Sequence, residues 1–356
     1  MRILLITEGL GSGGAERQIC GLAAMLTERG YECLLITYAP DKFYEEYLHA
    51  HHVDYEYVPI LLHKKNRVIR LVRYLYKYKP TTIISFLPSV NISCCLARIF
   101  YRCNLIVSER NCNIGISLRD KITFNLYRLA DYVIPNSYSQ SVFIRKHFPF
   151  LSKKVKTIVN FVDLNKFVPI DEKNKNDIFR IITVARYGVQ KNVLAYLDMV
   201  SKIKDIGLQI HFDWYGNKHY DEDYYAMVER KLKELGLEGY LTLHDATQDI
   251  VEKYQQADAF LLPSLYEGYP NVIIEAMCCE LPILCSRVFD NPKIVKEGEN
   301  GFLFNPYNVD EMANSIVKVS NLSLEERVII GKRNREKCIV NNTQNRFVNE
   351  YLTLLQ

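Results

Sequence analysis

Short apolar runs, each bounded by turn residues, alternate along this chain with longer stretches whose apolar positions recur at helical spacing. This alternation is typical of βα units that form a parallel sheet covered by helices on both faces. In the first half we expect strands at residues 3–7, 33–37, 55–58, 82–86, 105–108 and 132–135, and a segment at 153–159 that closes the sheet. Helices are expected between them, among others at residues 15–29, 65–78 and 118–129.

The pattern is interrupted at residues 171–177, where every side chain is charged or an amide and none can contribute to a hydrophobic core. We interpret this segment as a linker. The pattern then restarts, with strands expected at residues 179–185, 210–215, 240–243, 259–263, 283–285 and 301–304. Residues 324–356 carry no strand signal and predict two or more terminal helices. The sequence thus predicts an α/β protein with two doubly wound parallel-sheet domains, at residues 1–170 and 171–340.

The composition fits a folded protein of two domains, because the 356 residues are 48% hydrophobic and 24% charged. A net charge of +4 gives no ground for a nucleic-acid binder. The charge is unevenly divided: residues 1–170 carry 23 basic and 13 acidic side chains, whereas residues 171–356 carry 22 and 28. The two halves are therefore expected to face different partners.

Ten cysteines occur without a CxxC pair and without the Cys/His spacing of a zinc site. The first apolar run, at residues 3–6, is too short for a secretion signal or a membrane span. Together these features indicate a reduced, cytoplasmic protein, and we expect no bound metal.

A glycine-rich turn follows the first expected strand, where residues 9–14 satisfy the pattern G-x-G-x-x-G. A dinucleotide site also needs an acidic residue at the end of the second strand, but here Asp41 comes only after Pro40. Dinucleotide binding is therefore disfavoured, and a tight turn without a ligand remains an alternative. The turn is still suited to a phosphate, because glycines let backbone N–H groups approach an anion at the start of a helix.

Two glutamates, Glu267 and Glu275, frame the most informative segment of the chain. A buried strand is expected to end at Pro263, and a helix is expected to begin near Pro270, since proline is favoured in a first helical turn. Glu267 then lies in a loop at the carboxyl edge of the sheet and Glu275 just over one turn into the helix. Two carboxylates there could accept hydrogen bonds from sugar and ribose hydroxyls. The alternative is that both are ordinary solvated acids.

Two basic residues favour the first interpretation. Arg186 and Lys191 follow the first strand of the second domain, at the same carboxyl edge where open α/β sheets bind ligands. An Arg and a Lys together can hold a diphosphate and stabilise the negative charge that grows as its bond to a sugar breaks. Either residue alone would be read as a solvated surface charge.

These residues carry a resemblance to a known family. The segment from Glu267 to Glu275 resembles the E-x7-E signature of the retaining glycosyltransferases of family 4, and Arg186 with Lys191 is similar to the paired Arg and Lys of that family. Asn300-Gly301-Phe302-Leu303 resembles its NGxL strand, and the residues from Gly13 to Glu16 resemble its GGAE turn. The match covers nearly the whole chain in the right order.

The resemblance implies a GT-B fold, in which two Rossmann-like domains face each other across a cleft. It implies that the nucleotide-sugar donor binds the C-terminal domain and the acceptor binds the N-terminal one, and that the final helix, at residues 341–356, packs back onto the first domain. It implies no metal. Glu275 would bind the ribose, Glu267 the donor sugar or the developing positive charge, and Arg186 with Lys191 the diphosphate. The remaining donor contacts would come from Gly13, Gly14, Gly268, Tyr269, Pro270 and Asn271.

One departure concerns the strand at 105–108. Many family members have a functional histidine after it, whereas this chain has Ser108-Glu109-Arg110-Asn111. No nucleophile replaces the histidine, so we favour attack and departure on the same face of the sugar over a covalent intermediate. Glu109 and Arg110 are candidate cleft residues, with a surface turn as the alternative.

A stretch of one charge sign lies in the first half: no acidic side chain occurs between Glu56 and Glu109, but nine basic ones do. The helix expected at 65–78 has one basic and one apolar face, with Tyr74, Tyr76 and Tyr78 suited to a lipid headgroup level. This pattern predicts contact with an anionic membrane surface. A solvated basic face on a helix that packs on the core is the alternative.

We therefore expect a retaining glycosyltransferase that moves a hexosyl or N-acetylhexosaminyl group from a UDP-sugar to a polyprenyl-diphosphate-linked saccharide. It would act in bacterial surface polysaccharide or O-antigen assembly, at the cytoplasmic face of the plasma membrane. Alternatives of the same fold are a UDP-sugar epimerase and a GDP-sugar transferase. Alternatives of another class are an NAD-dependent oxidoreductase and a catalytically inactive subunit of a glycan-assembly complex.

Overall fold

The chain divides into two compact units in a computed structural model that describes residues 1–170 and 178–355, with only the backbone of residue 64. One unit is Met1–Phe161 with Gln344–Gln356, and the other is Val162–Thr343. The predicted linker at 171–177 lies outside the described residues. The division falls after Phe161 rather than after residue 170, because the residues that follow pack in the second unit. Phe167, for example, is buried and its ring contacts Tyr254.

The first unit contains, within the described residues, a six-stranded parallel sheet of order β3-β2-β1-β4-β5-β6. Its strands are β1 (Arg2–Ile6), β2 (Glu32–Thr37), β3 (Asp54–Tyr57), β4 (Thr82–Phe86), β5 (Asn104–Glu109) and β6 (Tyr132–Pro135). Its helices are α1 (Gly14–Glu28), α2 (Glu45–Ala50), α3 (Arg67–Tyr78), α4 (Pro88–Ala97), α5 (Leu118–Leu126), α6 (Tyr138–His147) and α14 (Gln344–Leu352). Short 3-10 turns are η1 (Pro59–Leu62), η2 (Lys64–Asn66), η3 (Tyr127–Leu129) and η4 (Pro149–Leu151). All six predicted strands are confirmed.

The segment at residues 153–159, expected to close the sheet, lies along the edge strand β6 but is not a continuous strand itself. This segment forms one isolated bridge, between Val155 and Val133, flanked by two backbone hydrogen bonds to Val133. Val155 and Ile158 are buried, so the apolar run that suggested a strand reflects packing against the core. The N–H of Ile158 also donates to the carbonyl of Pro135 at 3.2 Å, so the segment follows the edge of the sheet.

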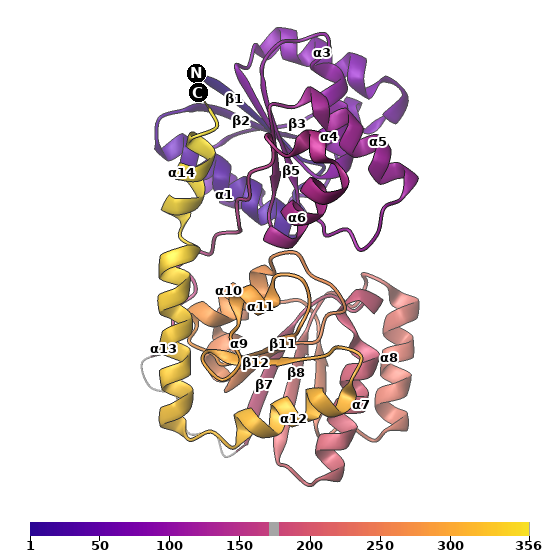
Figure 1. The fold of residues 1–356 in the computed structure, drawn as a ribbon, viewed down its shortest axis with the longest axis vertical. Coiled ribbons are helices and arrows are strands. Elements are labelled where there is room, and N and C mark those ends of the chain that lie inside the picture. The colour runs from indigo at the N-terminus through magenta and orange to yellow at the C-terminus, as the bar shows by residue number, and fades with distance from the viewer. Residues whose placement is uncertain (171–177, 356) are drawn as a thin grey trace. The chain divides into compact units, whose positions relative to one another are not determined.

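Alternating side chains of β1 explain how the first sheet is covered on both faces. Ile3 and Leu5 pack with residues of α1 and α14 in one core, whereas Leu4 and Ile6 pack with residues of α3, α4 and α5 in another. Figure 1 shows α14 beside α1 on one face and α3, α4 and α5 on the other. The C-terminal helix thus completes the core of the unit in which the chain begins.

The second unit repeats this topology, with a parallel sheet of order β12-β11-β10-β7-β8-β9. Its strands are β7 (Phe179–Val184), β8 (Ile210–Tyr215), β9 (Leu241–His244), β10 (Ala259–Leu262), β11 (Ile283–Ser286) and β12 (Gly301–Phe304). Its helices are α7 (Val193–Asp205), α8 (Glu222–Glu234), α9 (Ile250–Gln256), α10 (Asn271–Cys278), α11 (Asn291–Ile294), α12 (Val309–Ser320) and α13 (Leu324–Asn341), with the 3-10 turn η5 (Val189–Lys191).

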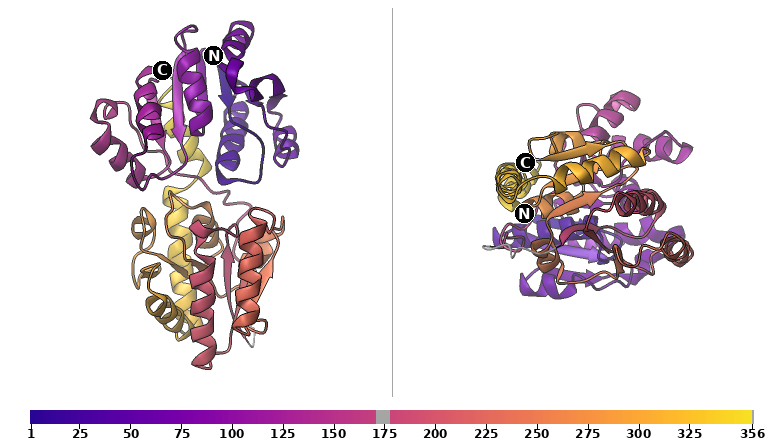
Figure 2. Two further views of the ribbon diagram at one scale, coloured as in Figure 1. Left: turned by 90° about the vertical axis from the view of Figure 1, so that its right-hand side faces the viewer. Right: turned by 90° about the horizontal axis from the view of Figure 1, so that it is seen from below.

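Helices again cover both faces of this second sheet. α7 packs against α8 and α12, whereas α10 packs against α13. Figure 2 (left) shows α7 and α8 in front of the sheet and the yellow α13 behind it. The strand order reverses between β7 and β10, and such a switch point is where open α/β sheets bind their ligands, beyond the carboxyl ends of the strands.

Candidate active site

Two loops meet at this switch point in the second unit. One follows β7 and leads through Arg186 into η5, and the other follows β10 and leads through Glu267 into α10. Pro270 stands directly before α10 with φ of −73°, a value that its ring imposes and that suits a helix start. The local sequence therefore ends the strand, turns the chain and begins the helix where the candidate residues lie.

Lys191 and Glu267 are brought together in an ion pair between Nζ and Oε1. Their side chains are only 13% and 8% exposed, so each charge depends on the other for compensation. Asn192 directly follows Lys191 in the left-handed region, with φ of 59°, a conformation that asparagine tolerates better than most residues. This turn aims the Lys191 side chain at the loop after β10.

Neighbouring amides hold the two loops in register. The backbone N–H of Leu265 donates to the carbonyl of Gln190 at 2.9 Å, and the Gln190 side-chain amide donates to the carbonyl of Tyr266 at 2.9 Å. Asn192 donates in turn to the carbonyl of Pro263 at 3.3 Å. The ion pair therefore sits in a frame that is fixed by hydrogen bonds on both sides.

Glu275 lies on α10 and is 2% exposed. The hydroxyl of Tyr254, on α9, donates a hydrogen bond to its Oε2 at 3.2 Å. Tyr254 was not predicted from the sequence, because no local pattern indicates that it contacts a residue 21 positions away. The carboxylate is therefore oriented by its neighbours before any ligand binds.

Arg186 is placed differently from Lys191. Its side chain is exposed, and its guanidinium lies over the ring of Tyr220 with 4.4 Å between Cζ and the ring centroid. Within residues 1–170 and 178–355, no carboxylate forms an ion pair with it. A cation stacked in this way is held in place and remains available to an anion. Tyr220 is another residue that the sequence did not reveal.

Tyr269 turns its side chain away from the loop surface. The ring is 8% exposed, and its hydroxyl accepts a hydrogen bond from Nδ2 of Asn342 at 3.0 Å. Tyr269 was predicted to contact the donor, and with its side chain buried only its backbone can do so. Gly268 and Asn271, which is the first residue of α10, are half-buried.

Gly13 and Gly14 belong to the first unit. Both are exposed, and α1 begins at Gly14, one residue earlier than predicted. A Cβ atom at Gly13 would lie 2.2 Å from Oε2 of Glu16, the end of a flexible side chain that can move, and the first turn of α1 follows directly. This is the arrangement that suits a phosphate near the start of a helix.

Glu109 and Arg110, at the end of β5 in the first unit, are both buried, so the surface turn considered as an alternative is wrong. Glu109 accepts hydrogen bonds from the hydroxyl of Tyr127 and from Nδ2 of Asn91, the latter at 3.2 Å. Burial raises the pKa of Glu109 to about 7. Neither Asn91 nor Tyr127 was predicted from the sequence.

Arg110 bonds to two residues far along the chain. Its guanidinium donates to Oδ1 of Asn160 and to the hydroxyl of Tyr351, each at 2.9 Å, and lies over the Phe86 ring. Burial lowers the pKa of this guanidinium. Arg110 therefore connects β4, β5, the end of the first unit's main segment and α14.

Nowhere in residues 1–170 and 178–355 do three or more His, Cys, Asp or Glu side chains gather in a way that could hold a metal ion. In the same part of the chain, no helix combines the length and the apolar character needed to cross a bilayer.

Two protein-family models match the chain. A model described as "Glycosyltransferase Family 4" matches residues 12–166, and one described as "Glycosyl transferases group 1" matches residues 166–337. The chain belongs to the family 4 glycosyltransferases. The two models meet at residue 166, close to the division between the two units.

Two curated relatives of this glycosyltransferase come from bacteria. The GalNAc-alpha-(1->4)-GalNAc-alpha-(1->3)-diNAcBac-PP-undecaprenol alpha-1,4-N-acetyl-D-galactosaminyltransferase of Campylobacter jejuni is 24% identical, over 97% of this chain and 93% of the relative. The UDP-Gal:alpha-D-GlcNAc-diphosphoundecaprenol alpha-1,3-galactosyltransferase of Escherichia coli is 31% identical, over 47% of this chain and 46% of the relative.

Solved structures show the fold of the glycosyltransferase to be GT-B. A glycosyltransferase from Rickettsia africae superposes with a TM-score of 0.86 at 17% identity, covering 99% of this chain and 97% of that one. HepE of Anabaena, solved in complex with UDP and glucose, superposes with a TM-score of 0.88 at 20% identity, covering 100% and 99%. The predicted fold class is confirmed.

Proposed function

We propose that this glycosyltransferase retains the anomeric configuration of its sugar and uses a UDP-sugar donor that binds the second unit. The observation that carries the proposal is the buried Lys191–Glu267 pair at the switch point of the second sheet, with Arg186 and Glu275 on the adjoining elements. HepE, which has the same fold, was solved with UDP and glucose. The relative from Escherichia coli is named for a UDP-Gal donor.

Each residue then has a stated task. Lys191 and Arg186 hold the diphosphate, and Glu275 accepts hydrogen bonds from the ribose hydroxyls. Glu267 contacts the donor sugar, and the backbone of residues 268–271 contacts sugar and phosphate. The backbone of the turn at Gly13 and Gly14 binds phosphate, and the first unit binds the acceptor. No metal takes part in this scheme.

The reaction proceeds on one face of the sugar. The bond between the anomeric carbon and the diphosphate oxygen breaks as the acceptor hydroxyl oxygen forms its bond to the same carbon. The departing diphosphate oxygen takes the proton of that hydroxyl, and Arg186 with Lys191 stabilises the growing negative charge. Glu267 is held by Lys191 and therefore serves charge stabilisation rather than nucleophilic attack.

We infer that the acceptor is a polyprenyl-diphosphate-linked saccharide in the assembly of a bacterial surface polysaccharide or O-antigen. Support comes from relatives whose names specify undecaprenol-linked saccharides, among them one from Campylobacter jejuni that is 26% identical over 78% of both chains. Such an acceptor places the enzyme at the cytoplasmic face of the plasma membrane. We infer that the transferred group is hexosyl or N-acetylhexosaminyl, as in the relatives named for galactosyl and N-acetylgalactosaminyl transfer.

An anionic membrane surface is the partner we propose for the first unit, but the structure changes which residues would touch it. Tyr74, expected at headgroup level, donates its hydroxyl to Glu56 at 2.6 Å. Arg67, expected on the basic face, is buried and donates to the carbonyl of Leu61. α3 therefore contributes less of the contact than the sequence suggested.

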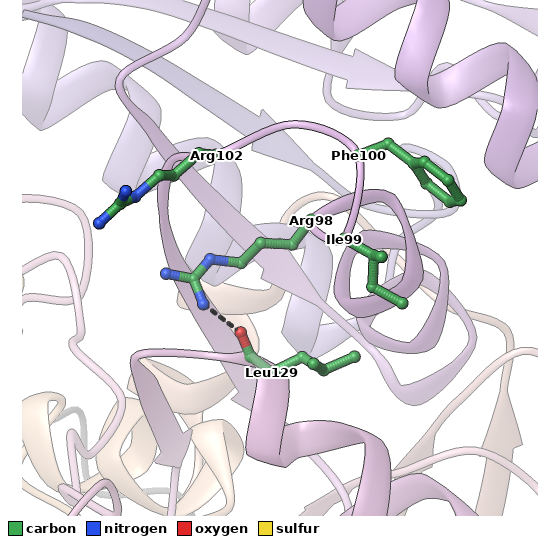
Figure 3. Close-up of a pocket in the computed structure, with 5 residues that line it drawn as sticks. All are labelled: Arg98, Ile99, Phe100, Arg102 and Leu129. Atoms are coloured by element: carbon green, nitrogen blue, oxygen red, sulfur yellow. Dashed lines mark hydrogen bonds between the residues drawn. The ribbon is translucent and has the colours of Figure 1, made fainter.

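The neighbouring turn between α4 and β5 has the better composition. Ile99 and Phe100 are 60% and 63% exposed, and Tyr76 of α3 donates its hydroxyl to the Phe100 carbonyl at 2.8 Å. Residues of this turn and Leu129 line a hollow of about 350 Å³. Figure 3 shows the guanidinium of Arg98 bonded to the carbonyl of Leu129, whereas Arg102 points away from it. Exposed apolar tips beside a cation are what an anionic lipid surface attracts.

Nucleotide binding by the purified chain tests the donor proposal. UDP, GDP, ADP and NAD are titrated calorimetrically against the parent chain and against Arg186→Ala. Tight binding of UDP alone, weakened by the substitution, supports the proposal. Preference for GDP would favour a GDP-sugar transferase, and binding of NAD would contradict the account. Turnover without an acceptor would identify a UDP-sugar epimerase, and absence of any turnover an inactive assembly subunit.

A further inference from the structure

The chain passes between the two units twice, after Phe161 and after Thr343. On the first unit's side, the Gln18 side chain bonds to both backbone polar groups of Phe161, donating to its carbonyl at 2.9 Å and accepting from its N–H at 3.0 Å. The Phe161 ring fills the space beside Gly21, where a Cβ atom would lie 2.2 Å from the ring. Gln18 and Gly21 both lie on α1, the helix that begins in the glycine turn.

On the second unit's side, a single residue joins the two passages. The carbonyl of Asn342 accepts a hydrogen bond from the N–H of Val162 at 2.9 Å, so the outgoing and returning segments are bonded to each other. The side-chain amide of the same Asn342 donates to the hydroxyl of Tyr269 at 3.0 Å. Asn342 and Tyr269 are 3% and 8% exposed, so water competes little for these bonds.

Tyr269 belongs to the loop between β10 and α10, and α10 packs against α13. Arg335 of α13 donates to the carbonyl of Cys278, the last residue of α10, and to the carbonyl of Phe167, each through Nη1. Gly331 approaches so closely that a Cβ atom there would lie 2.2 Å from the carbonyl oxygen of Glu280. A movement of the loop is therefore transmitted to the end of α13 rather than absorbed by loose packing.

We propose that the Tyr269–Asn342 hydrogen bond couples occupancy of the donor loop to the two segments that connect the units, which makes Tyr269 a positioning residue. This inference rests on the proposed donor site. Nucleotide at residues 267–275 fixes the Tyr269 backbone, its hydroxyl fixes Asn342, and the Asn342 carbonyl fixes Val162. Val162 directly follows Phe161, whose backbone is bonded to the Gln18 side chain, so the first passage is held at both of its ends. Both passages are thus stiffened when the donor is bound.

Hydrogen exchange with UDP as the probe tests this coupling in the full chain. In the parent, saturating UDP slows exchange of peptides that cover residues 264–275, and also of peptides that cover 158–168 and 338–346, by about 5-fold or more, the lower range of ordinary coupling between sites. In Tyr269→Phe, UDP still binds and still protects residues 264–275. Protection of the two connecting segments falls at least to half.

Further variants separate coupling from a merely structural role. Asn342→Leu removes the other partner of the bond, and the double variant loses no more protection than either single one, because one interaction is removed in all three. Tyr307→Phe removes the hydroxyl of an exposed tyrosine in the same unit and keeps the full UDP effect.

The outcomes distinguish two failures. If the parent binds UDP but the connecting segments gain no protection, or if Tyr269→Phe and Asn342→Leu keep all of it, the coupling is wrong and the donor site stands. If the parent binds no UDP, the proposed function fails and this inference fails with it. Additive losses in the double variant would also overturn the coupling.

Discussion

Lys191 and Glu267 form an ion pair in which neither side chain is more than 13% exposed, although 76 residues separate them in the chain. The pair joins the loop after β7 to the loop after β10, on the two sides of the switch point of the second sheet. We propose that this pair provides the cation that holds the diphosphate and the carboxylate that contacts the sugar.

The first prediction concerns the cost of separating this pair. Lys191→Ala leaves the Glu267 carboxylate buried without its partner, and we expect a loss of about 3 kcal/mol in the free energy of unfolding. The double variant Lys191→Met/Glu267→Gln recovers much of that loss, because no uncompensated charge remains. Urea denaturation measures the free energy of unfolding. We expect calorimetry to show weak UDP binding by both variants. Equal stability of the parent and Lys191→Ala would mean that the two charges are solvated.

The second prediction concerns Glu275. Glu275→Gln keeps the shape of the side chain and a group for Tyr254 to donate to, but removes the charge that we assign to the ribose hydroxyls. UDP affinity should fall by about 10- to 100-fold, as for the loss of a charged hydrogen bond. Glu238→Gln, on the exposed surface of the same unit, should bind UDP as the parent does. If both variants bind UDP equally well, Glu275 has only a structural role.

The third prediction concerns the strand end that carries Arg186. A Cβ atom at Gly216 would lie 2.1 Å from the carbonyl oxygen of Ala185. The nearest atoms are all backbone atoms of Ala185 and Arg186, so no flexible side chain can move aside to make room. Gly216→Ala should cost about 1–3 kcal/mol of stability and weaken UDP binding as Arg186 is displaced. Gly239→Ala is the control, since a Cβ atom there meets nothing within 4 Å. Thermal unfolding and calorimetry together check both effects.

The fourth prediction concerns pH. Burial raises the pKa of Glu109 from an ordinary value of 4.5 to about 7. Between these two values the folded state binds more protons than the unfolded state, so stability falls as pH rises through this window, by about 3 kcal/mol in all. Glu109→Gln removes the titrating group while an acceptor for Tyr127 remains. The stability of the variant should therefore vary less between pH 4.5 and 7, and an unchanged pH profile would show that Glu109 titrates normally.

The fifth prediction concerns the turn between α4 and β5. The parent should float with vesicles that contain phosphatidylglycerol and not with phosphatidylcholine alone. The double variant Ile99→Asn/Phe100→Ser should lose most of this binding, whereas Ile206→Asn, at an equally exposed apolar residue of the second unit, should not. Absence of flotation of the parent would exclude the proposed membrane contact.

Much of this account could be predicted from the sequence, because the signals are local. Short apolar runs bounded by turn residues located every strand of both sheets to within a residue or so, and Pro270 located the start of α10. The domain division was misplaced, since the charged segment at 171–177 is the most polar stretch but Phe167, which precedes it, already packs in the second unit.

The supporting contacts could not be predicted, because they join residues that are distant in sequence. Tyr254 orients Glu275, Tyr220 lies under Arg186, and Asn342 reaches Tyr269 across 73 residues. No spacing rule connects such positions. Burial also could not be predicted for Glu109, since a charged residue at the end of a strand is ordinarily solvated.

Transfer itself tests the central claim most directly. The purified chain is incubated with a panel of UDP-sugars and a synthetic undecaprenyl-diphosphate-linked saccharide, and the released UDP and the anomeric configuration of the product are measured. We predict that UDP is released with one sugar of the panel, that this release requires the acceptor, and that the product retains the anomeric configuration. In Lys191→Ala the rate of UDP release should fall at least 100-fold, as for the loss of an interaction that stabilises the transition state. Inverted product, or equal turnover by Lys191→Ala, would contradict the proposed active site.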